Sequence, residues 1–577
     1  MRHLVLLLLV LFSLTALAEM DVDGIEELLP RHETRAERLK WEGREDEMPD
    51  RDRMSDPPPQ APVRNVAEWE PATGVIVRYP LGLPYSLLRD FDDDVTLHVV
   101  VSNGSYNSAV SNLTNNGVDM DRVEFLIRSN DSIWTRDYGP WYVFDGNGDV
   151  NIIDHTYNRP WRPNDNMIPV YFGQQQGIPV ISHDMFHTGG NYMTDGHHIS
   201  MSTELVYNEA SSNNGMNSSQ VDQLMFNYYG VEDYEVLDYI ESGGIHHIDT
   251  WAKFLDEETV LVKEVWPSHH TYTKLNQRAA LIASLQASTG RNYQVHRVYC
   301  HDIGWSDPAS YTNSLILNDC VYVPTFGNSS YDNQALQAYE DAMPGYTVSG
   351  YYYSGFITDD ALHCRAKGAY DAGMLRVEHV PLREEMTGPV EITALVDDRS
   401  ESGVSVVELH YRFAGEFWQT INMSAQGGDL YAAEIPSPVS DTSVDYYIHA
   451  EDNSGRVEGM PRVEPAHWYN FSILAGDMTS AGPASAPARL NAAYPNPFNP
   501  KTTFSFELEY ADPVLLQVFD SSGRLIRSLI DGPCQPGTTE VDWDGRDDAG
   551  RRLASGVYHY RLRAAGIQYS RPVVLAK

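Results

Sequence analysis

The chain has 577 residues, of which 42% are hydrophobic and 11% aromatic, and its formal net charge is −40 at pH 7. This length predicts two to four domains, and the composition is that of a folded protein. The strong negative charge excludes nucleic acid as a partner, because such a chain cannot neutralise a row of phosphates. It favours solubility and would attract cationic substrates.

The N-terminus has the pattern of an export signal. Residues 1–18 combine a basic start, an apolar run over residues 4–12 and a small-residue ending at Ala18, which predicts a secretory signal peptide. The run is too short for a membrane span, and we expect none elsewhere in the chain. Residues 19–63 are charged and proline-bearing, which indicates a mobile leader or pro-segment. We therefore expect a secreted or cell-surface protein.

The next region, residues 64–383, alternates β-rich and helical stretches. Residues 95–101 and 313–323 are β-rich, whereas residues 275–288 favour a helix. This alternation predicts an α/β domain.

The pattern changes to short alternating strands after residue 383. We expect an all-β, Ig-like sandwich over residues 384–475, with strands at residues 390–396, 405–413, 430–435 and 443–450. Residues 476–489 are rich in Ala, Ser, Pro and Gly and are predicted to be a linker. A second β-sandwich is expected over residues 490–577, where Asp-Gly turns separate the strands.

The last module carries four motifs of a known kind of domain. They are Y-P-N-P-F-N-P-K-T-T (494–503), V-F-D-S-S-G-R (518–524), W-D-G-R-D (543–547) and L-A-S-G-V-Y-H-Y-R-L (553–562). Residues 490–577 resemble the C-terminal Ig-like sorting domains of bacterial type IX secretion cargo, and flagellar hook-capping proteins have a similar module. The resemblance implies bacterial secretion machinery as a partner, followed by surface anchoring or release.

Four cysteines are few for an exported chain: Cys300, Cys320, Cys364 and Cys534. A secreted disulfide scaffold would carry more at regular spacing. Cys300 and Cys320 either pair or remain buried thiols. Cys364 has no obvious mate.

Four short segments of the α/β region hold the groups needed to attack a guanidinium ion. They are S-I-W-T-R-D-Y-G-P-W (132–141), H-T-G-G-N (187–191), H-H-I-D-T-W (246–251) and A-L-H-C-R (361–365). A flat cation requires carboxylates for its nitrogens, a soft nucleophile for its carbon and a proton carrier. Asp137, Asp249, Cys364 and His247 supply these groups.

Asp137 lies among aromatic residues that can wall a pocket for a cation, Trp134 first among them. Gly139-Pro140 predicts a turn after it. The alternative is an Asp paired with its own neighbour Arg136. The Gly-Gly pair of residues 187–191 allows close backbone approach to a ligand, and Asn191 is a candidate substrate-binding residue.

His247 and Asp249 are two residues apart, so an extended backbone would point both side chains to one face. They can act as a general base with its orienting carboxylate, or as two separate substrate contacts. A zinc site with His187 and His363 is the alternative, although no HExxH spacing supports it.

Cys364 is followed by Arg365 and Lys367, a basic setting that is expected to lower the pKa of the thiol. An inert buried cysteine and a cysteine peptidase are the alternatives. The carboxylates of the companion segments favour a guanidinium substrate, since a peptidase requires an oxyanion hole instead.

From about residue 69 to residue 374 the chain resembles the agmatine deiminase and bacterial peptidylarginine deiminase family of the guanidino-group-modifying superfamily. The four segments arrive in the family's order. The resemblance implies a pseudo-fivefold α/β propeller with a central active site and no metal or cofactor. It implies that Asp137 and Asp249 hold the guanidinium, that Cys364 forms a covalent thiouronium and that His247 transfers protons. Asn313 matches a family position beside the nucleophile.

The export features are similar to those of the secreted peptidylarginine deiminases, in which two arginines bind the carboxylate of a C-terminal arginine. Arg159 and Arg162 match that pair, and the alternative is surface solvation or pairing with Asp154 or Asp165. We therefore predict conversion of peptidyl arginine to citrulline with release of ammonia. Two alternatives are a deiminase of agmatine or free arginine, and a non-catalytic surface protein that binds through its Ig-like modules.

Overall fold

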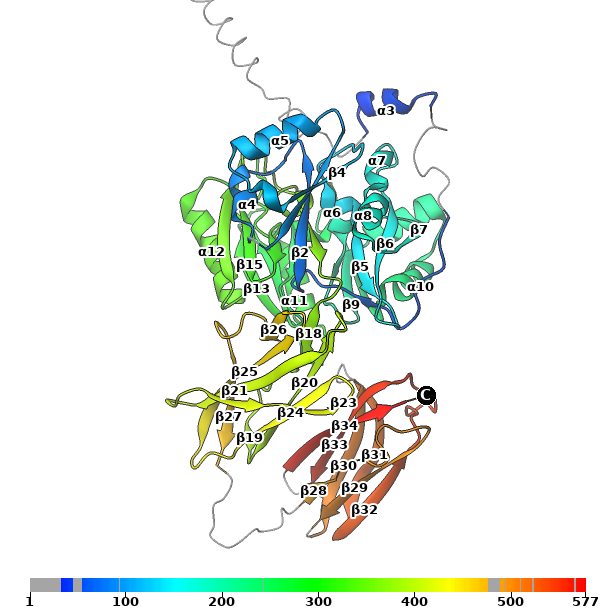
Figure 1. Ribbon diagram of the computed structural model, residues 1–577, viewed down its shortest axis with the longest axis vertical. Helices are drawn as coiled ribbons and strands as arrows, with labels where there is room; N and C mark the ends of the chain where they lie inside the picture. The colour runs from blue at the N-terminus through cyan, green and yellow to red at the C-terminus, as the bar shows by residue number, and fades with distance from the viewer. Residues whose placement is uncertain are drawn as a thin grey trace, which may run out of the picture.

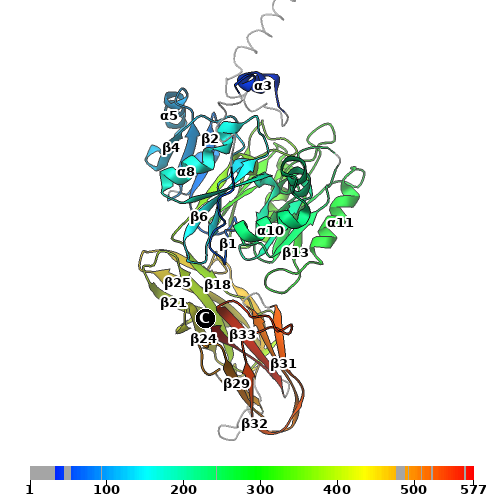
Figure 2. The same cartoon turned by 90° about the vertical axis from the view of Figure 1, so that its right-hand side faces the viewer.

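The computed structural model describes residues 33–44, 54–92, 94–241, 243–475, 488–491, 493–508, 510–520, 524–564 and 567–576. The predicted signal peptide and residues 476–487 of the predicted linker lie outside these ranges. The α/β region forms one end of the molecule, and the β-rich modules lie at the other end (Figures 1 and 2). No helix among the described residues has the length and apolar character needed to cross a membrane.

Five small sheets build the α/β region. Their strand orders are β17–β2–β3–β4, β1–β5–β6–β7, β10–β9–β8, β11–β12–β13 and β14–β15–β16. The strands are β1 (Arg64–Asn65), β2 (Ala72–Tyr79), β3 (Thr96–Val101), β4 (Val123–Ile127), β5 (Trp141–Phe144), β6 (Val150–Tyr157), β7 (Val180–His187), β8 (Met193–Thr194), β9 (Ile199–Thr203), β10 (Asp233–Leu237), β11 (Ala252–Phe254), β12 (Thr259–Glu264), β13 (Gln294–Tyr299), β14 (Leu315–Leu317), β15 (Cys320–Thr325), β16 (Thr347–Tyr352) and β17 (Lys367–Tyr370).

The same pairing pattern recurs in all five sheets. One strand pairs antiparallel with one neighbour and parallel with the other, as β6 does with β5 and β7. The other four central strands are β2, β9, β12 and β15. Because β17 pairs with β2, the two ends of the region share a sheet. This fivefold repetition agrees with the architecture that the resemblance implied.

Helices make the crossovers that parallel strands require. Each parallel pair is joined through at least one of α4 (Tyr85–Asp90), α5 (Tyr106–Asn115), α7 (Pro163–Asn166), α8 (Ile168–Gln176), α9 (Leu205–Glu209), the π-helix η4 (Ala210–Asn214), α10 (Ser218–Tyr229), α11 (Tyr272–Ile282) and α12 (Ser329–Ala342). The helix predicted at residues 275–288 is α11, which begins and ends earlier. The predicted β-run 313–323 is a hairpin of β14 and β15, since Asn318 adopts a φ of 53° between them.

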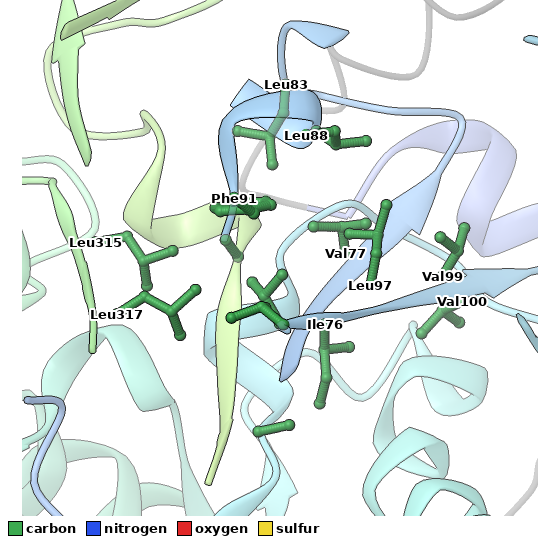
Figure 3. Packing of buried hydrophobic residues seen from close by; sticks show 14 of the residues in the cluster. Ile76, Val77, Leu83, Leu88, Phe91, Leu97, Val99, Val100, Leu315 and Leu317 are labelled. Carbon is green, nitrogen blue, oxygen red and sulfur yellow. The ribbon is translucent and has the colours of Figure 1, made fainter. Parts of the chain in front are cut away.

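The apolar core of the first sheet extends to a neighbouring sheet. Nearly all residues of its strands β2 and β3 are buried, on both faces, as expected for parallel strands. Figure 3 shows side chains of both strands packed near α4, with Leu315 and Leu317 of β14 beside them. This packing fixes the positions of the loops that follow β2 and precede β14.

The β-rich modules match the predicted strand runs. The first combines β18–β20–β24–β23 with β19–β27–β25–β21–β22, and β26 pairs with β25. Its strands are β18 (Leu375–Glu378), β19 (Met386–Thr387), β20 (Val390–Asp398), β21 (Val404–Phe413), β22 (Gln419–Asn422), β23 (Ser424–Gly427), β24 (Leu430–Ile435), β25 (Thr442–Asp452), β26 (Val457–Met460) and β27 (Tyr469–Leu474). Because β18 pairs with β20, the sheet begins before the predicted boundary at residue 384.

The last module contains the sheets β28–β29–β32 and β31–β30–β33–β34, which enclose a separate apolar core. Its strands are β28 (Ala488–Leu490), β29 (Thr502–Leu508), β30 (Asp512–Asp520), β31 (Leu525–Cys534), β32 (Gly537–Trp543), β33 (Gly556–Ala564) and β34 (Ile567–Leu575). Two packed antiparallel sheets are the architecture expected of an Ig-like sandwich.

The structure decides one open alternative and changes one expectation. Cys300 and Cys320 are buried free thiols and do not pair. The described part of the leader, which was expected to be mobile, packs on the domain surface. Asp56 exchanges backbone and side-chain hydrogen bonds with Ser182, and residues 35–41 form a helix that contacts the pocket described below.

Candidate active site

Asp137 lies in the short helix α6 (Thr135–Tyr138), which ends at Gly139 with a φ of 94°. Its side chain is buried, and its backbone carbonyl accepts a hydrogen bond from His155 Nε2 at 3.0 Å. Arg136 does not pair with Asp137. Its guanidinium lies 3.3 Å from Glu68 and 3.5 Å from the carbonyl of His363. Arg136 therefore does not neutralise the Asp137 carboxylate, which remains available to a cationic ligand.

The Gly-Gly loop comes as close to the site as its sequence suggested. Gly190 lies in the 3-10 helix η3 (Gly189–Asn191), and its N–H donates to Asp137 Oδ1 at 3.3 Å. A Cβ atom at Gly190 would lie 2.5 Å from His247 Nδ1 and 2.8 Å from Asp137 Oδ1. Only glycine fits between these two side chains.

Asn191 has a different environment from the one predicted. Its Oδ1 accepts hydrogen bonds from Thr203 N, Thr203 Oγ1 and Ile248 N, and its Nδ2 donates to the carbonyl of Thr203. These contacts use the amide to anchor the segment that carries His247 and Asp249. Asn191 therefore has the contacts of a positioning residue rather than of a substrate ligand.

His247 and Asp249 meet the site through a tight turn rather than an extended strand. His246 has a φ of 60°, and residues Ile248–Thr250 form the 3-10 helix η5. His247 Nδ1 lies 3.5 Å from Asp137 Oδ1, and His247 is fully buried. Asp249 Oδ1 has no hydrogen-bond partner among the described residues. A buried carboxylate oxygen of this kind is suited to a cationic ligand.

Cys364 lies in the 3-10 helix η6 (His363–Arg365), beside Asp249 and Asn313. Its Sγ is 3.8 Å from Asp249 Oδ2 and 3.4 Å from Asn313 Nδ2. Asn313 Oδ1 also accepts hydrogen bonds from the N–H groups of Ala361 and Cys364, at 3.1 and 3.3 Å. Asn313 therefore fixes the turn that presents the sulfur, and Ile133 and Trp134 pack against that sulfur.

A small pocket joins these groups to the predicted arginines. Its lining residues are Trp134, Asp137, Tyr157, Arg159, Arg162, Ile245, Asp359, Asp360 and Cys364. Arg159 and Arg162 reach it together because a turn hydrogen bond of 2.8 Å joins Arg162 N to the carbonyl of Arg159. The ion pair of Arg162 is with Glu37 of the leader, at 2.8 Å, and not with Asp154 or Asp165.

The expected lowering of the Cys364 thiol pKa is wrong. Burial, followed by the carboxylates of Asp249, Asp360 and Asp137, raises that pKa well above its ordinary value, although Asn313 opposes the shift. The two basic neighbours are turned away. Arg365 pairs with Asp360 at 2.9 Å, and the ammonium of Lys367 lies 4.0 Å from the Trp141 ring centre. The protein alone therefore favours the neutral thiol.

The two carboxylates differ in their proton affinity. Burial raises the pKa of Asp137 to about 7, the charge of Arg159 opposes this shift, and Asp249 adds to it. Burial also raises the pKa of Asp249, but the hydrogen bond and charge of His363 outweigh that effect and lower it on balance. At neutral pH Asp249 is therefore ionised, while Asp137 is close to its midpoint.

Glu68 was not predicted as a site residue, and His363 was named only as a ligand of the alternative zinc site. His363 Nδ1 lies 2.8 Å from Asp249 Oδ2, and His363 Nε2 lies 2.7 Å from Glu68 Oε2. Glu68 also contacts Lys253 at 2.6 Å and Arg136 at 3.3 Å. The only sequence signal was the position of His363 directly before the nucleophile, since Glu68 lies in a different segment.

The histidines proposed for zinc do not surround one point. His363 is held between two carboxylates, whereas His187 lies against the rings of His155 and Tyr192. Among the described residues, one group of three side chains could hold an ion, namely Asp92, Asp319 and Cys320, and none of them lines the pocket.

Comparison with known families agrees with this geometry. Residues 64–367, more than half of the chain, match the family model described as Porphyromonas-type peptidyl-arginine deiminase. The chain belongs to this family. Residues 494–566 match the FlgD Ig-like domain. Membership indicates a deiminase that acts on guanidino groups.

Relatives named agmatine deiminase are similar to the same region. The agmatine deiminase of Medicago truncatula is 24% identical over 270 residues, which cover 39% of this chain and 71% of that protein. The solved agmatine deiminase of Enterococcus faecalis is 20% identical with a TM-score of 0.46, over 54% of this chain and 96% of its own. The solved agmatine deiminase of C. jejuni is 16% identical with a TM-score of 0.44, over 54% and 96% of the two chains.

Proposed function

We propose that this family member hydrolyses the guanidinium of arginine at peptide C-termini to the ureido group of citrulline, with release of ammonia. One observation carries the proposal. Cys364 Sγ lies 3.8 Å from Asp249 Oδ2 in a pocket that it shares with Asp137, and His247 Nδ1 lies 3.5 Å from Asp137 Oδ1. Cys364 and Asp137 thus line one small cavity, and Asp249 and His247 lie directly against these two residues.

In the proposed complex the guanidinium nitrogens donate to Asp137 and Asp249, in the bidentate manner that carboxylates offer this cation. Asp249 Oδ1, which has no hydrogen-bond partner in the described part of the chain, is available for this contact, and Trp134 supplies an aromatic wall. The cation also supplies the positive charge that the free site lacks. Its arrival would therefore lower the pKa of the Cys364 thiol and stabilise the thiolate.

The reaction then takes two steps. The thiolate attacks the guanidinium carbon, a C–N bond breaks, and a proton from His247 lets the nitrogen leave as ammonia, so that a thiouronium remains on Cys364. In the second step His247 takes a proton from water, the resulting oxygen nucleophile adds to the same carbon, and the C–S bond breaks. The products are the ureido group and the free thiol.

Arg159 and Arg162 favour a substrate that carries a carboxylate. Both line the pocket, and the guanidinium of Arg162 stacks 4.6 Å from the Trp134 ring centre. A peptide that ends in arginine offers its cation to the acidic residues and its α-carboxylate to these arginines. Agmatine has no carboxylate, so this pair of arginines gives it no anchor.

We further propose that the protein works outside the cell. The signal-like residues 1–18 and the Ig-like match at residues 494–566 support export, and the sorting motifs support the bacterial type IX secretion machinery as a partner. The extracellular substrates would then be proteins or peptides with accessible arginine.

The test compares three substrates at equal concentration: a peptide with a free C-terminal arginine, the same peptide as its C-terminal amide, and agmatine. We expect kcat/KM to be highest for the free acid, with ureido product and ammonia in equal amounts. Replacement Cys364→Ala should remove the product from all three while the thermal unfolding midpoint is kept. A higher kcat/KM for agmatine would support the second candidate, an agmatine deiminase, which the named relatives favour.

A further inference from the structure

A helix of the leader reaches the pocket described above. Residues Arg35–Trp41 form α3, which begins with a capping box between Thr34 and Glu37. Glu37 N donates to Thr34 Oγ1 at 3.0 Å, and Thr34 N donates to Glu37 Oε2 at 2.8 Å. The box fixes the Glu37 carboxylate and leaves its other oxygen directed elsewhere.

That second oxygen binds an arginine of the pocket. Arg162 Nε donates to Glu37 Oε1 at 2.8 Å, and the side chains of Arg162 and Glu37 are only 1% and 12% exposed. Arg162 is at the same time the residue that stacks on Trp134 in the pocket wall. A leader carboxylate thus lies on the guanidinium that we assign to the substrate carboxylate.

A second ion pair holds the other end of the helix. Lys40 pairs with Asp131, whose oxygens also accept hydrogen bonds from the N–H and the Nδ2 of Asn164, each at 2.8 Å. Trp41 beside it is buried. Figures 1 and 2 place α3 at the end of the α/β region that faces away from the β-sandwich modules. The ion pairs of Glu37 in the first turn and Lys40 in the last turn together fix the position of α3 on the α/β domain.

Charge decides what this contact does to a substrate. Burial raises the pKa of Glu37, but hydrogen bonds from Thr34 and Arg162 outweigh burial and lower it on balance, so Glu37 is ionised at neutral pH. An incoming carboxylate would meet a guanidinium whose charge is already neutralised, and it would be repelled by Glu37. A guanidino substrate without a carboxylate would meet no such competition.

We propose that residues 33–44 are an intramolecular competitor for carboxylate-bearing substrates, in which α3 holds Glu37 at the substrate-carboxylate position on Arg162. The inference rests on the proposed function, because it adds a regulator to the same pocket. Removal or displacement of this segment would raise the affinity for peptides that end in arginine. The leader would thereby restrict the enzyme until it is processed.

The first test is Glu37→Gln in the full chain, with Glu33→Gln as the matched control, since Glu33 pairs with Arg38 on the same segment. For the free-acid peptide we expect Glu37→Gln to lower KM by about ten-fold at unchanged kcat, the size of one charged contact. KM for agmatine and for the amidated peptide should stay unchanged, and Glu33→Gln should match the parent chain.

The second test uses a protease site inserted within residues 45–53 of the full chain. Cleavage should lower KM for the free-acid peptide in the same way, and a synthetic peptide of residues 33–44 should restore the original KM by competition. The same peptide with Glu37→Gln should inhibit more weakly. Binding of the free-acid peptide to chains that also carry Cys364→Ala, measured by calorimetry, gives a readout that does not require turnover.

Three results for Glu37→Gln would overturn the inference. KM for the free-acid peptide could stay unchanged, or it could rise because Glu37 orients Arg162 for the substrate. KM for agmatine could also fall equally, which would mean that the segment only covers the pocket sterically. Failure of the proposed function looks different. In that case either no substrate yields ureido product, or agmatine is still the preferred substrate in Glu37→Gln and in the cleaved chain.

Discussion

Asp249 is held by His363, whose Nδ1 lies 2.8 Å from the Asp249 carboxylate while its Nε2 lies 2.7 Å from Glu68. Burial and the nearby Arg136 outweigh the charge of Glu68 and lower the pKa of His363 on balance. Each ring nitrogen nevertheless faces a carboxylate oxygen, and only the charged imidazolium donates to both, so we assign that form to the folded state. His363, held in turn by Glu68, thus keeps Asp249 ionised and fixes the orientation of its carboxylate.

The first prediction concerns this positioning pair. His363→Gln removes the charge-assisted contact to Asp249, so we expect kcat/KM to fall roughly 10- to 100-fold. The pKa of Asp249 should also rise without its cation, so the fall of kcat/KM below the Asp137 midpoint should become steeper, as two acidic groups then titrate there. The measurement is kcat/KM against pH.

The control is His183→Gln, since His183 is also buried and hydrogen-bonded, to Tyr229, away from the pocket. It should lower the unfolding midpoint without a shift of the pH profile. If His363→Gln changes only the unfolding midpoint, the positioning role is wrong.

A second prediction follows from the space around Gly190. The substitution Gly190→Ala would place a methyl group between His247 and Asp137, so we expect kcat/KM to fall by about 100-fold or more, as misplacement of reacting groups does. Gly104→Ala is the control, because nothing lies within 4 Å of a Cβ atom there. Steady-state kinetics and thermal unfolding measure both variants. Near-normal activity of Gly190→Ala would contradict the close approach.

The raised pKa of Asp137 predicts how stability depends on pH. Its folded pKa of about 7 lies above its ordinary value of 3.8, so the folded protein binds this proton more tightly than the unfolded chain does. Protonated Asp137 therefore contributes to the free energy of unfolding at low pH, and this contribution is lost as pH rises from about 3.8 to about 7. Asp137→Asn should remove this part of the decline, which thermal unfolding at pH 5 and pH 8 can measure.

The same carboxyl group predicts a rise in activity. Only ionised Asp137 binds the cation, so kcat/KM of the parent chain should increase as pH rises through about 7. For the stability prediction, the raised pKa of Asp137 would be wrong if the unfolding midpoints of the parent chain and Asp137→Asn change in parallel between pH 5 and pH 8.

The environment of Cys364 predicts selective labelling. Its thiol is mostly protonated in the free site, because burial and three carboxylates raise its pKa. We expect cationic 2-chloroacetamidine to label Cys364 at least about ten-fold faster than neutral 2-chloroacetamide, since the carboxylates bind the cation and lower the thiol pKa. Peptide mass spectrometry measures both rates.

Cys534 is the internal control, because it is partly exposed and lies in the last module. It should show no such preference between the two reagents. Equal labelling rates at Cys364 would mean that the pocket does not select cations.

The sequence predicted which residues lie together at the pocket more completely than it predicted their surroundings. Asp137, His247, Asp249 and Cys364 could be found because each lies in a short segment whose neighbours suit a cation-binding site. The strands of the β-rich modules were found for a similar reason, since alternation of apolar residues is a local property. Whether Cys300 pairs with Cys320 could not be decided from the sequence, because spacing along the chain says nothing about the direction in which two side chains point; both are free thiols.

By itself, the sequence determined which reactive groups the chain carries and in what order, because thiol, imidazole and carboxylate groups are properties of the residue types. The tertiary structure alone decided how those groups are tuned. In the folded chain Arg365 and Lys367 contact Asp360 and the Trp141 ring rather than the Cys364 sulfur. Glu68 contacts His363, and Glu37 of the leader pairs with Arg162. Burial and charge act through distances in space, and those distances join segments that lie far apart along the chain.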